Sequence, residues 1–155
     1  MSRRDQIKLS EDQQRELIEQ ERIVVVASFG SRGWPHLMPL WYVPREGEVW
    51  IYTYAKSQKV RNLERDPRAT LLIETGHEYN ELRGLMAEAE AEIHRGFDTV
   101  LALATELNLR YNPGIESLPE EGRSVLEAQA SKRVAIQFHA QRVATWDHRK
   151  LGGTY

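Results

Sequence analysis

The sequence predicts an α+β fold, with about six antiparallel strands in a barrel-like sheet and helices at its periphery. Two consecutive hairpins, each with a glycine-containing turn, open the strand region. One later segment alternates alanine with glutamate, as does a strand with one buried face. Apolar residues at helical spacing occur in only a few separate segments. The 155 residues contain no internal repeat or flexible linker, so we expect one domain over residues 1–155.

A helix and two hairpins form the first part of the predicted domain. Ser10 and Gln13 have the spacing of a capping box, so we expect a helix that runs to about Glu21. The segments that follow are rich in β-branched or apolar residues, and glycine-containing turn signals separate them. The three strands of these hairpins are expected over residues 22–29, 35–43 and 49–53.

A short helix is expected where the third strand ends. Val60 and Leu63 lie three residues apart, which puts both on one face of a helix over residues 56–65. Ser57 is of the residue type that caps helix N-termini, and an Asp-Pro pair ends the segment.

The second half of the chain is expected to combine strands with longer helices. In its most regular strand, alanines fall on one face and glutamates on the other, which predicts a closely packed inner face and a wet outer face. The expected elements are strands over 69–74, 85–93 and 133–146, helices over 97–109 and 119–132, a polar loop over 75–80 and a polar tail over 147–155.

The composition excludes several classes of function. The chain has no cysteine, which excludes disulfide frameworks, thiolate zinc sites, iron–sulfur clusters and cysteine nucleophiles. The polar N-terminus lacks a signal-peptide pattern, and the longest apolar run, residues 23–27, is far shorter than the roughly 20 residues of a membrane-spanning helix. We therefore expect a cytoplasmic protein with no membrane partner. The net charge of −2 predicts no nucleic-acid partner.

Metal and hydrolase chemistry lack their motifs. The five histidines are scattered with no pair at metal-ligand spacing, so we expect no metal site. The chain has no Gly-x-Ser-x-Gly elbow, no Walker loop and no Gly-x-Gly-x-x-Gly fingerprint. Most of the histidines are expected at the surface or in hydrogen bonds, and His36 and His139 stand out because they fall inside predicted strands.

Basic residues gather at the start of the short helix. Lys56, Lys59 and Arg61 lie within six residues, together with Ser57. A helix N-terminus presents unpaired N–H groups and partial positive charge, so a hydroxyl and cations at this point form a phosphate site. The alternative is a solvated helix face, which is common. However, cations are unfavourable at a helix N-terminus unless an anion compensates them.

Two prolines mark the second predicted strand. Pro35 and Pro39 cannot donate to a strand ladder, so this strand is expected at an edge or a bulge of the sheet. A planar ring could then rest against it. The apolar side chains of this strand and the next are expected to be structural, with Leu37 and Leu40 in the core and Trp41 and Trp50 as core or interface anchors.

The order of these segments resembles a known family. It resembles the pyridoxamine 5′-phosphate oxidase-like family, and more narrowly the flavin/deazaflavin oxidoreductases of that superfamily, many of which use coenzyme F420. The similarity runs from about residue 9 to residue 92 and returns weakly in the closing strand and residues 146–151. The motifs that carry it are Trp34-Pro35-His36, Leu37-Met38-Pro39-Leu40-Trp41-Tyr42, Lys56-Ser57-Gln58-Lys59-Val60-Arg61-Asn62-Leu63 and Arg65-Asp66-Pro67-Arg68.

The resemblance implies a six-stranded antiparallel split β-barrel of the FMN-binding type. It also implies a homodimer with two cofactor sites at the subunit interface. By the same resemblance, the cofactor phosphate would be held by Lys56, Ser57 and Lys59, and the loop that contains them would be supported by Arg61 and Asn62. Along the ring would lie Met38, Pro39 and Leu40 and the backbone near Tyr52 and Thr53. The second subunit would contribute Trp146 and Arg149.

The activity that the resemblance implies is hydride transfer to or from a small organic substrate, with F420 as the first choice of cofactor and FMN as the second. Such a cofactor carries the hydride chemistry itself, so no catalytic residue is assigned. The local surplus of cations favours F420, whose phosphate and glutamate tail are polyanionic, and hence a reductase of an activated C=C or C=N bond. The arginine and histidine with which true pyridoxamine 5′-phosphate oxidases bind their substrate have no clear counterpart, so vitamin B6 oxidation is not implied.

Two other classes of function stay open. A haem-binding or haem-degrading barrel would need an axial histidine, and His36 and His139 are the candidates in strands. A non-catalytic flavin-binding module would bind the cofactor tightly without turnover.

Overall fold

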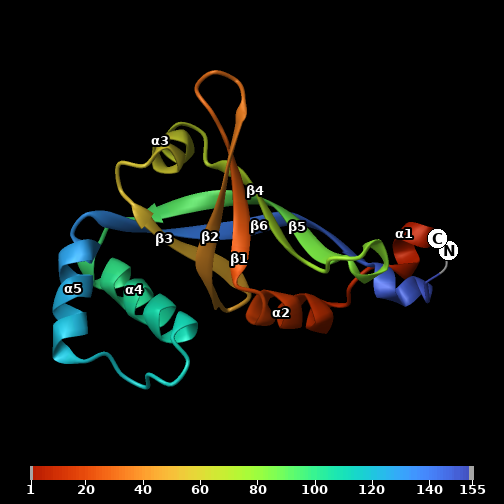
Figure 1. Cartoon of the computed structure of the whole chain (residues 1–155). Coiled ribbons are helices and arrows are strands. Elements are labelled where there is room, and N and C mark those ends of the chain that lie inside the picture. The colour runs from red at the N-terminus through yellow and green to blue at the C-terminus, as the bar shows by residue number, and fades with distance from the viewer. Residues whose placement is uncertain (1, 154–155) are drawn as a thin grey trace.

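The computed structural model describes residues 2–153, and at its centre lies a closed barrel of six antiparallel strands (Figure 1). Around the barrel the strands follow the order β1-β2-β3-β6-β5-β4. This confirms the predicted α+β class and its peripheral helices. The elements are α1 (Arg3–Gln6), α2 (Glu11–Gln20), β1 (Ile23–Phe29), β2 (Pro35–Arg45), β3 (Glu48–Tyr54), α3 (Gln58–Arg65), β4 (Arg68–Thr75), η1 (Tyr79–Glu81), β5 (Arg83–His94), α4 (Phe97–Tyr111), α5 (Glu120–Ala130), β6 (Arg133–Asp147) and η2 (His148–Leu151).

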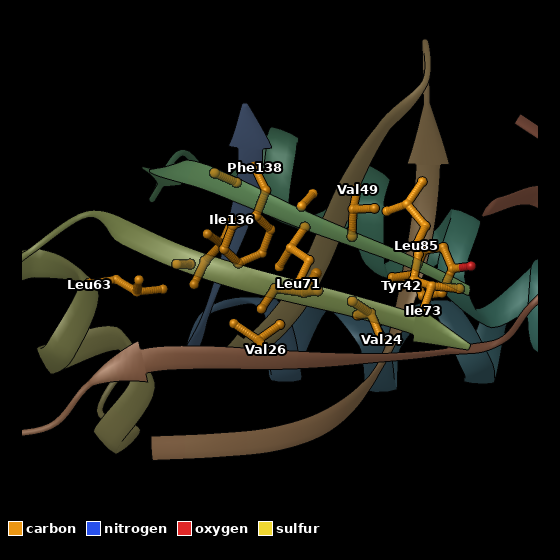
Figure 2. Packing of buried hydrophobic residues seen from close by; sticks show 14 of the residues in the cluster. Val24, Val26, Tyr42, Val49, Leu63, Leu71, Ile73, Leu85, Ile136 and Phe138 are labelled. Atoms are coloured by element: carbon orange, nitrogen blue, oxygen red, sulfur yellow. The ribbon is translucent and has the colours of Figure 1, made fainter. Parts of the chain in front are cut away.

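The inward faces of the strands form the main core (Figure 2). Val26, Ile73 and Phe138 come from β1, β4 and β6, and each is almost fully buried. Alternate residues of a strand point to opposite faces, so one face of each strand fills the barrel. In β5, Ala87 and Ala89 are buried whereas Glu88 is exposed, which confirms the alternation that the sequence predicts.

Two helices cover part of the outside of the barrel. α4 and α5 pack against each other and against β2, β3 and β6, at the lower left of Figure 1. Their apolar residues form a second, smaller core with outward-facing strand residues. Its buried members are Val43, Val100, Leu103, Ala130 and Ala135.

Strand β2 changes its pairing partners along its length. Its first seven residues, 35–41, pair with β1, and its last four, 42–45, pair with β3. On β3, residues 48–51 pair with β2, whereas the pairs of residues 52–54 are all with β6. The first half of β2 and the last part of β3 therefore diverge, and the sheet is split on this side. The projecting β1–β2 hairpin stands beside this split in Figure 1.

The structure corrects three expectations. Leu37 is 57% exposed and is not a core residue, because it lies on the outer face of the projecting hairpin; Leu40, on the opposite face, packs against the core. The extra helix α1 begins with a capping box between Ser2 and Asp5. The tail begins as the short helix η2, which Asp147 caps by accepting a hydrogen bond from the N–H of Arg149.

None of the helices within residues 2–153 combines the length and the apolar character that crossing a bilayer requires.

Candidate cofactor site at the split side of the barrel

Helix α3 lies at the end of the barrel where β3 ends, and it packs against β1 (Figure 1). Val60 and Leu63 are buried, as their spacing predicts. Ser57 occupies the N-cap position with extended backbone angles, but its side chain makes no capping hydrogen bond. The backbone N–H groups of the first turn therefore keep their capacity to bind an external acceptor.

Lys59 is the most unusual cation of this region. Only 8% of it is exposed, and its Nζ donates to Thr53 Oγ1 over 2.8 Å. Among residues 2–153 no carboxylate lies within ion-pair distance of Lys59. Burial, and secondarily the positive charge of Arg133, lower the pKa of Lys59. A buried ammonium group without an acidic partner is costly, so an anion bound beside it would be strongly favoured.

Arg133 is a component of this site that the sequence did not single out. It begins β6 directly opposite Tyr54, the last residue of β3. Its guanidinium lies 4.7 Å from the centre of the Tyr52 ring, and within residues 2–153 it has no carboxylate partner. The adjacent cations Lys132 and Arg133 before a strand were a signal, but only the β3–β6 pairing reveals that they lie beside α3.

Asn62 joins α3 to the barrel. It is fully buried, its Nδ2 donates to Ser28 Oγ over 3.1 Å, and its Oδ1 accepts from Gln58 Nε2 over 2.8 Å. Arg65 adds a hydrogen bond of 2.5 Å from its guanidinium to the Phe29 carbonyl. The bonds to Ser28 and Phe29 fix helix α3 relative to β1.

Two buried polar atoms near the helix start have no hydrogen-bond partner. They are Ser57 Oγ and His36 Nδ1. His36 pairs across the hairpin with Ser28, and it lines a small pocket between the β1–β2 turn and α3, together with Trp34, Arg32 and Gln58. Buried polar atoms almost always have partners in folded proteins, so such atoms beside a pocket indicate a binding site.

The remaining cations at the helix start are exposed. Lys56 and Arg61 lie at the surface and, within the described residues, have no acidic partner. Two other arginines of this region are already engaged: Arg68 with Asp66, at 2.6 Å, and Arg65 with Phe29. Within the described residues, Lys56, Lys59, Arg61 and Arg133 therefore carry positive charge that no carboxylate compensates, as does Arg32 in the pocket beside His36.

The residues expected along a cofactor ring flank the split in the sheet. Met38 and Leu40 lie on the part of β2 that pairs with β1 alone, and Tyr52 and Thr53 lie on the diverging end of β3. The Tyr52 side chain packs outward against the α4–α5 core, so only its backbone faces the split side. Pro39 points to the outer face, opposite to Met38 and Leu40, because successive side chains of a strand alternate.

A comparison with protein families assigns this architecture. The family model of pyridoxamine 5′-phosphate oxidase matches residues 10–147. The chain belongs to the pyridoxamine 5′-phosphate oxidase family. Its fold is thereby the flavin-binding split barrel that the resemblance implied, in a family that includes oxidoreductases.

Solved structures of the same fold support this membership. A conserved hypothetical protein from Mycobacterium tuberculosis (Rv2991) is 35% identical, with a TM-score of 0.88 over 100% of this chain and 95% of that one. An F420 reductase has a TM-score of 0.62 at 19% identity, over 83% of this chain and 93% of that one. The haem storage protein HutZ from Vibrio cholerae has a TM-score of 0.65 at 14% identity, over 86% and 92%. No curated protein matches the chain.

Two residues expected at the cofactor site of this family member lie at the other end of the barrel. Trp146 packs over Gly84, where a Cβ atom would approach the indole ring to 2.3 Å. The guanidinium of Arg149 binds the Asp147 carboxylate over 2.8 and 2.7 Å. Within one chain neither reaches α3, which lies at the opposite side of Figure 1.

The second histidine of interest, His139, has both ring nitrogens engaged. Nδ1 is 2.9 Å from Glu48 Oε1, and Nε2 is 2.9 Å from Glu92 Oε2. The hydrogen bond with Glu92, followed by that with Glu48, raises the pKa of His139. In this arrangement His139 has no free nitrogen for a haem iron. Among residues 2–153, no group of three or more histidines and carboxylates is arranged to hold a metal ion.

Proposed function

We propose that this member of the pyridoxamine 5′-phosphate oxidase family is an oxidoreductase that binds F420, or failing that FMN, by its phosphate at the N-terminus of α3. The observation that carries the proposal is Lys59, a buried cation whose hydrogen-bond partner is a neutral hydroxyl. A phosphate would supply the negative charge that this position lacks.

The donors around Lys59 fit a phosphate group. Ser57 Oγ is buried and unpartnered, and the first N–H groups of α3 lack a side-chain cap. A helix N-terminus with a hydroxyl and cations around it is a standard arrangement for phosphate binding. Lys59, Ser57 and the N–H groups would therefore contact the phosphate, while Lys56 and Arg61 would contribute from the surface.

The charge around the site supports F420 over FMN. Lys56, Lys59, Arg61 and Arg133 are four cations of this region that have no acidic partner among residues 2–153. One phosphate compensates at most two of these charges. A longer polyanion such as the phosphate and glutamate tail of F420 would compensate more of them, and this favours the deazaflavin.

A second copy of the chain would complete the site. The outer face of the β1–β2 hairpin exposes Ile23, Phe29, Leu37 and Trp41 at 45–57% each. Several large apolar side chains exposed on one face are typical of an interface between proteins. We assign it to a homodimer, since the face lies beside the proposed site and the family resemblance implies a cofactor shared by two subunits. In this arrangement Trp146 and Arg149 of the second copy would approach the site, with Arg149 exchanging Asp147 for the cofactor.

The chain's own residues would bind and orient, rather than perform acid–base chemistry. When bound, the flavin or deazaflavin supplies the hydride-transfer chemistry. Lys59 and Ser57 would fix the phosphate, and the diverging strands at Met38, Leu40 and Thr53 would hold the ring and exclude water from one face. The substrate would be a small organic molecule with an activated C=C or C=N bond.

The test is to purify the protein from its native host, record its visible spectrum and then titrate the apoprotein with F420 and with FMN. We expect a deazaflavin spectrum and tighter binding of F420. A flavin spectrum with tighter FMN binding would overturn the cofactor preference, a Soret band would replace the proposal by haem binding, and tight binding without turnover on a broad substrate panel would favour a non-catalytic module.

A further inference from the structure

A second cavity lies at the end of the barrel opposite to α3. It has a volume of about 190 Å³ and is covered by α2, the helix that precedes β1. Ser57 and Lys59, which carry the proposed function, do not line it, so this cavity is independent of the phosphate site.

The wall of the cavity is apolar. Leu71, Ile73, Leu85 and Phe138 line it from three strands, and Figure 2 shows these side chains pointing into the same interior. Each of the four is at most 4% exposed. Ala87 of β5 also lines the cavity, and a larger side chain at this position would occupy part of the space. Protein interiors seldom leave voids larger than a water molecule, so a space of this size is a distinct feature.

The rim of the cavity carries three charged side chains, and two of them have ionic partners. Arg15 of α2 is ion-paired with Asp12 over 2.6 Å. Glu48 lies 2.9 Å from His139, and it also accepts a hydrogen bond from Gln137. The third, Glu11, lies in the first turn of α2, where the helix dipole favours a negative charge. None of the three is a buried cation without an acidic partner, in contrast to Lys59 at the other end of the barrel.

We infer that this cavity binds a small neutral apolar molecule, of the size of benzene or a short alkyl chain. Water is a poor occupant, because a buried water needs two to four polar partners and the inner wall offers apolar side chains. An apolar cavity of about 150 Å³ in another protein stays dry and binds benzene, so a cavity of about 190 Å³ is large enough for the same class of ligand. Ile18 of α2 lines the cavity as well, so the helix would act as its cover.

The test uses benzene and hexanoate as probes of the full chain. At benzene concentrations about ten times Kd, we expect Tm to rise by about 3 °C or more, since the ligand binds the folded state alone. Hexanoate is expected to raise Tm by no more than benzene does. Ala87→Leu would fill the cavity and abolish the benzene effect, whereas the matched control Ala128→Leu, on the exposed surface of α5, would keep it.

A structural measurement keeps the inference testable if Ala87→Leu folds poorly. Crystals of the unaltered protein under xenon pressure are expected to show xenon between Leu71 and Phe138. The absence of xenon there, an equal benzene effect in Ala87→Leu, or a response to hexanoate alone would overturn the inference. Because none of these measurements involves the cofactor, their outcome is separate from that of the F420 titration.

Discussion

A buried cation lies at each end of the barrel, and the two cations differ in their hydrogen-bond and ion-pair partners. Beside η2, Arg83 is 7% exposed, donates to the Gln13 carbonyl and to Glu16 over 3.3 Å, and lies 3.9 Å from Asp147. Asp147 also binds Arg149. Beside α3, Lys59 is 8% exposed and its partner is the hydroxyl of Thr53. Arg83 and Lys59 are thus buried to a similar extent but differ in their partners. Arg83 has carboxylate partners and stabilises the fold, whereas Lys59 has none, and we propose that it binds a ligand.

The largest expected effect is at the end of the barrel where Arg83 has acidic partners. Asp147→Asn leaves Glu16 as the remaining acidic partner of the buried Arg83 and removes the carboxylate that Arg149 binds. We expect a loss of about 2–4 kcal/mol in the free energy of unfolding at pH 7. The hydrogen bond from Arg149 lowers the pKa of Asp147, so its contribution is present above the unfolded pKa of about 3.9 and is lost as the pH falls through the folded value. Urea unfolding at several pH values measures this.

A matched control for this change is Asp12→Asn, which removes an exposed pair with Arg15. We expect it to cost less than about 1 kcal/mol. Equal losses in the two variants would show that burial of the partner cation does not matter, and the contrast between the two ends would then fail.

At the other end of the barrel, where Lys59 has no acidic partner, Lys59→Met should weaken cofactor binding but should not destabilise the fold. We expect F420 or FMN binding to weaken by about 1.5–3 kcal/mol, the range for a hydrogen bond to a charged group, as measured by titration calorimetry. Burial lowers the pKa of Lys59 in the folded protein, so this residue opposes folding below its unfolded pKa of about 10.4, and this penalty fades as the pH rises toward that value. The apoprotein variant should thus be at least as stable at pH 7.

The control for this variant is Lys8→Met, which removes an exposed lysine that is paired with Asp5. Cofactor affinity should not change. If Lys59→Met changed cofactor affinity by no more than Lys8→Met, then the start of α3 would be ordinary solvated surface.

The proposed cofactor site also depends on the surface through which a second copy of the chain would bind. Leu37→Asp places a charge on the exposed hairpin face, and we expect the dimer Kd, measured by sedimentation equilibrium, to rise at least about tenfold because burying that charge is costly. Cofactor binding should weaken in parallel if two subunits form the site. Unchanged self-association would assign the dimer to another surface.

The smallest expected effect concerns an exposed cation with acidic partners. Hydrogen bonds with Glu92 and then Glu48 raise the pKa of His139, so the stability it contributes is complete below its unfolded pKa of about 6.5 and disappears as the pH rises through the folded value. His139→Gln should lower stability by roughly 0.2–1 kcal/mol at acidic pH. Thermal unfolding at pH 6 and in mildly alkaline buffer tests this, and a loss that persisted in alkali would point to packing instead.

Local patterns predicted the strands and α3 because their evidence lies within a few residues, as with Val60 and Leu63 or the alternation around Ala87. Arg133 could not be placed in the site from the sequence, since only the pairing of β3 with β6 brings it near Lys59. Leu37 was misassigned to the core for a related reason. Alternation tells which residues share a face, but not whether another element covers that face.

The changed pairing of β2 has a consequence for solubility. Residues 35–41 have no paired strand on one side among residues 2–153, and such free edges favour pairing with a strand from another molecule. Alternate residues direct their backbone groups to the same side, so Pro35 and Pro39 act on one edge. Both lack an N–H, which removes two donors that an aggregating strand would need. The two prolines thus protect the opening at the proposed cofactor site against amyloid-like growth.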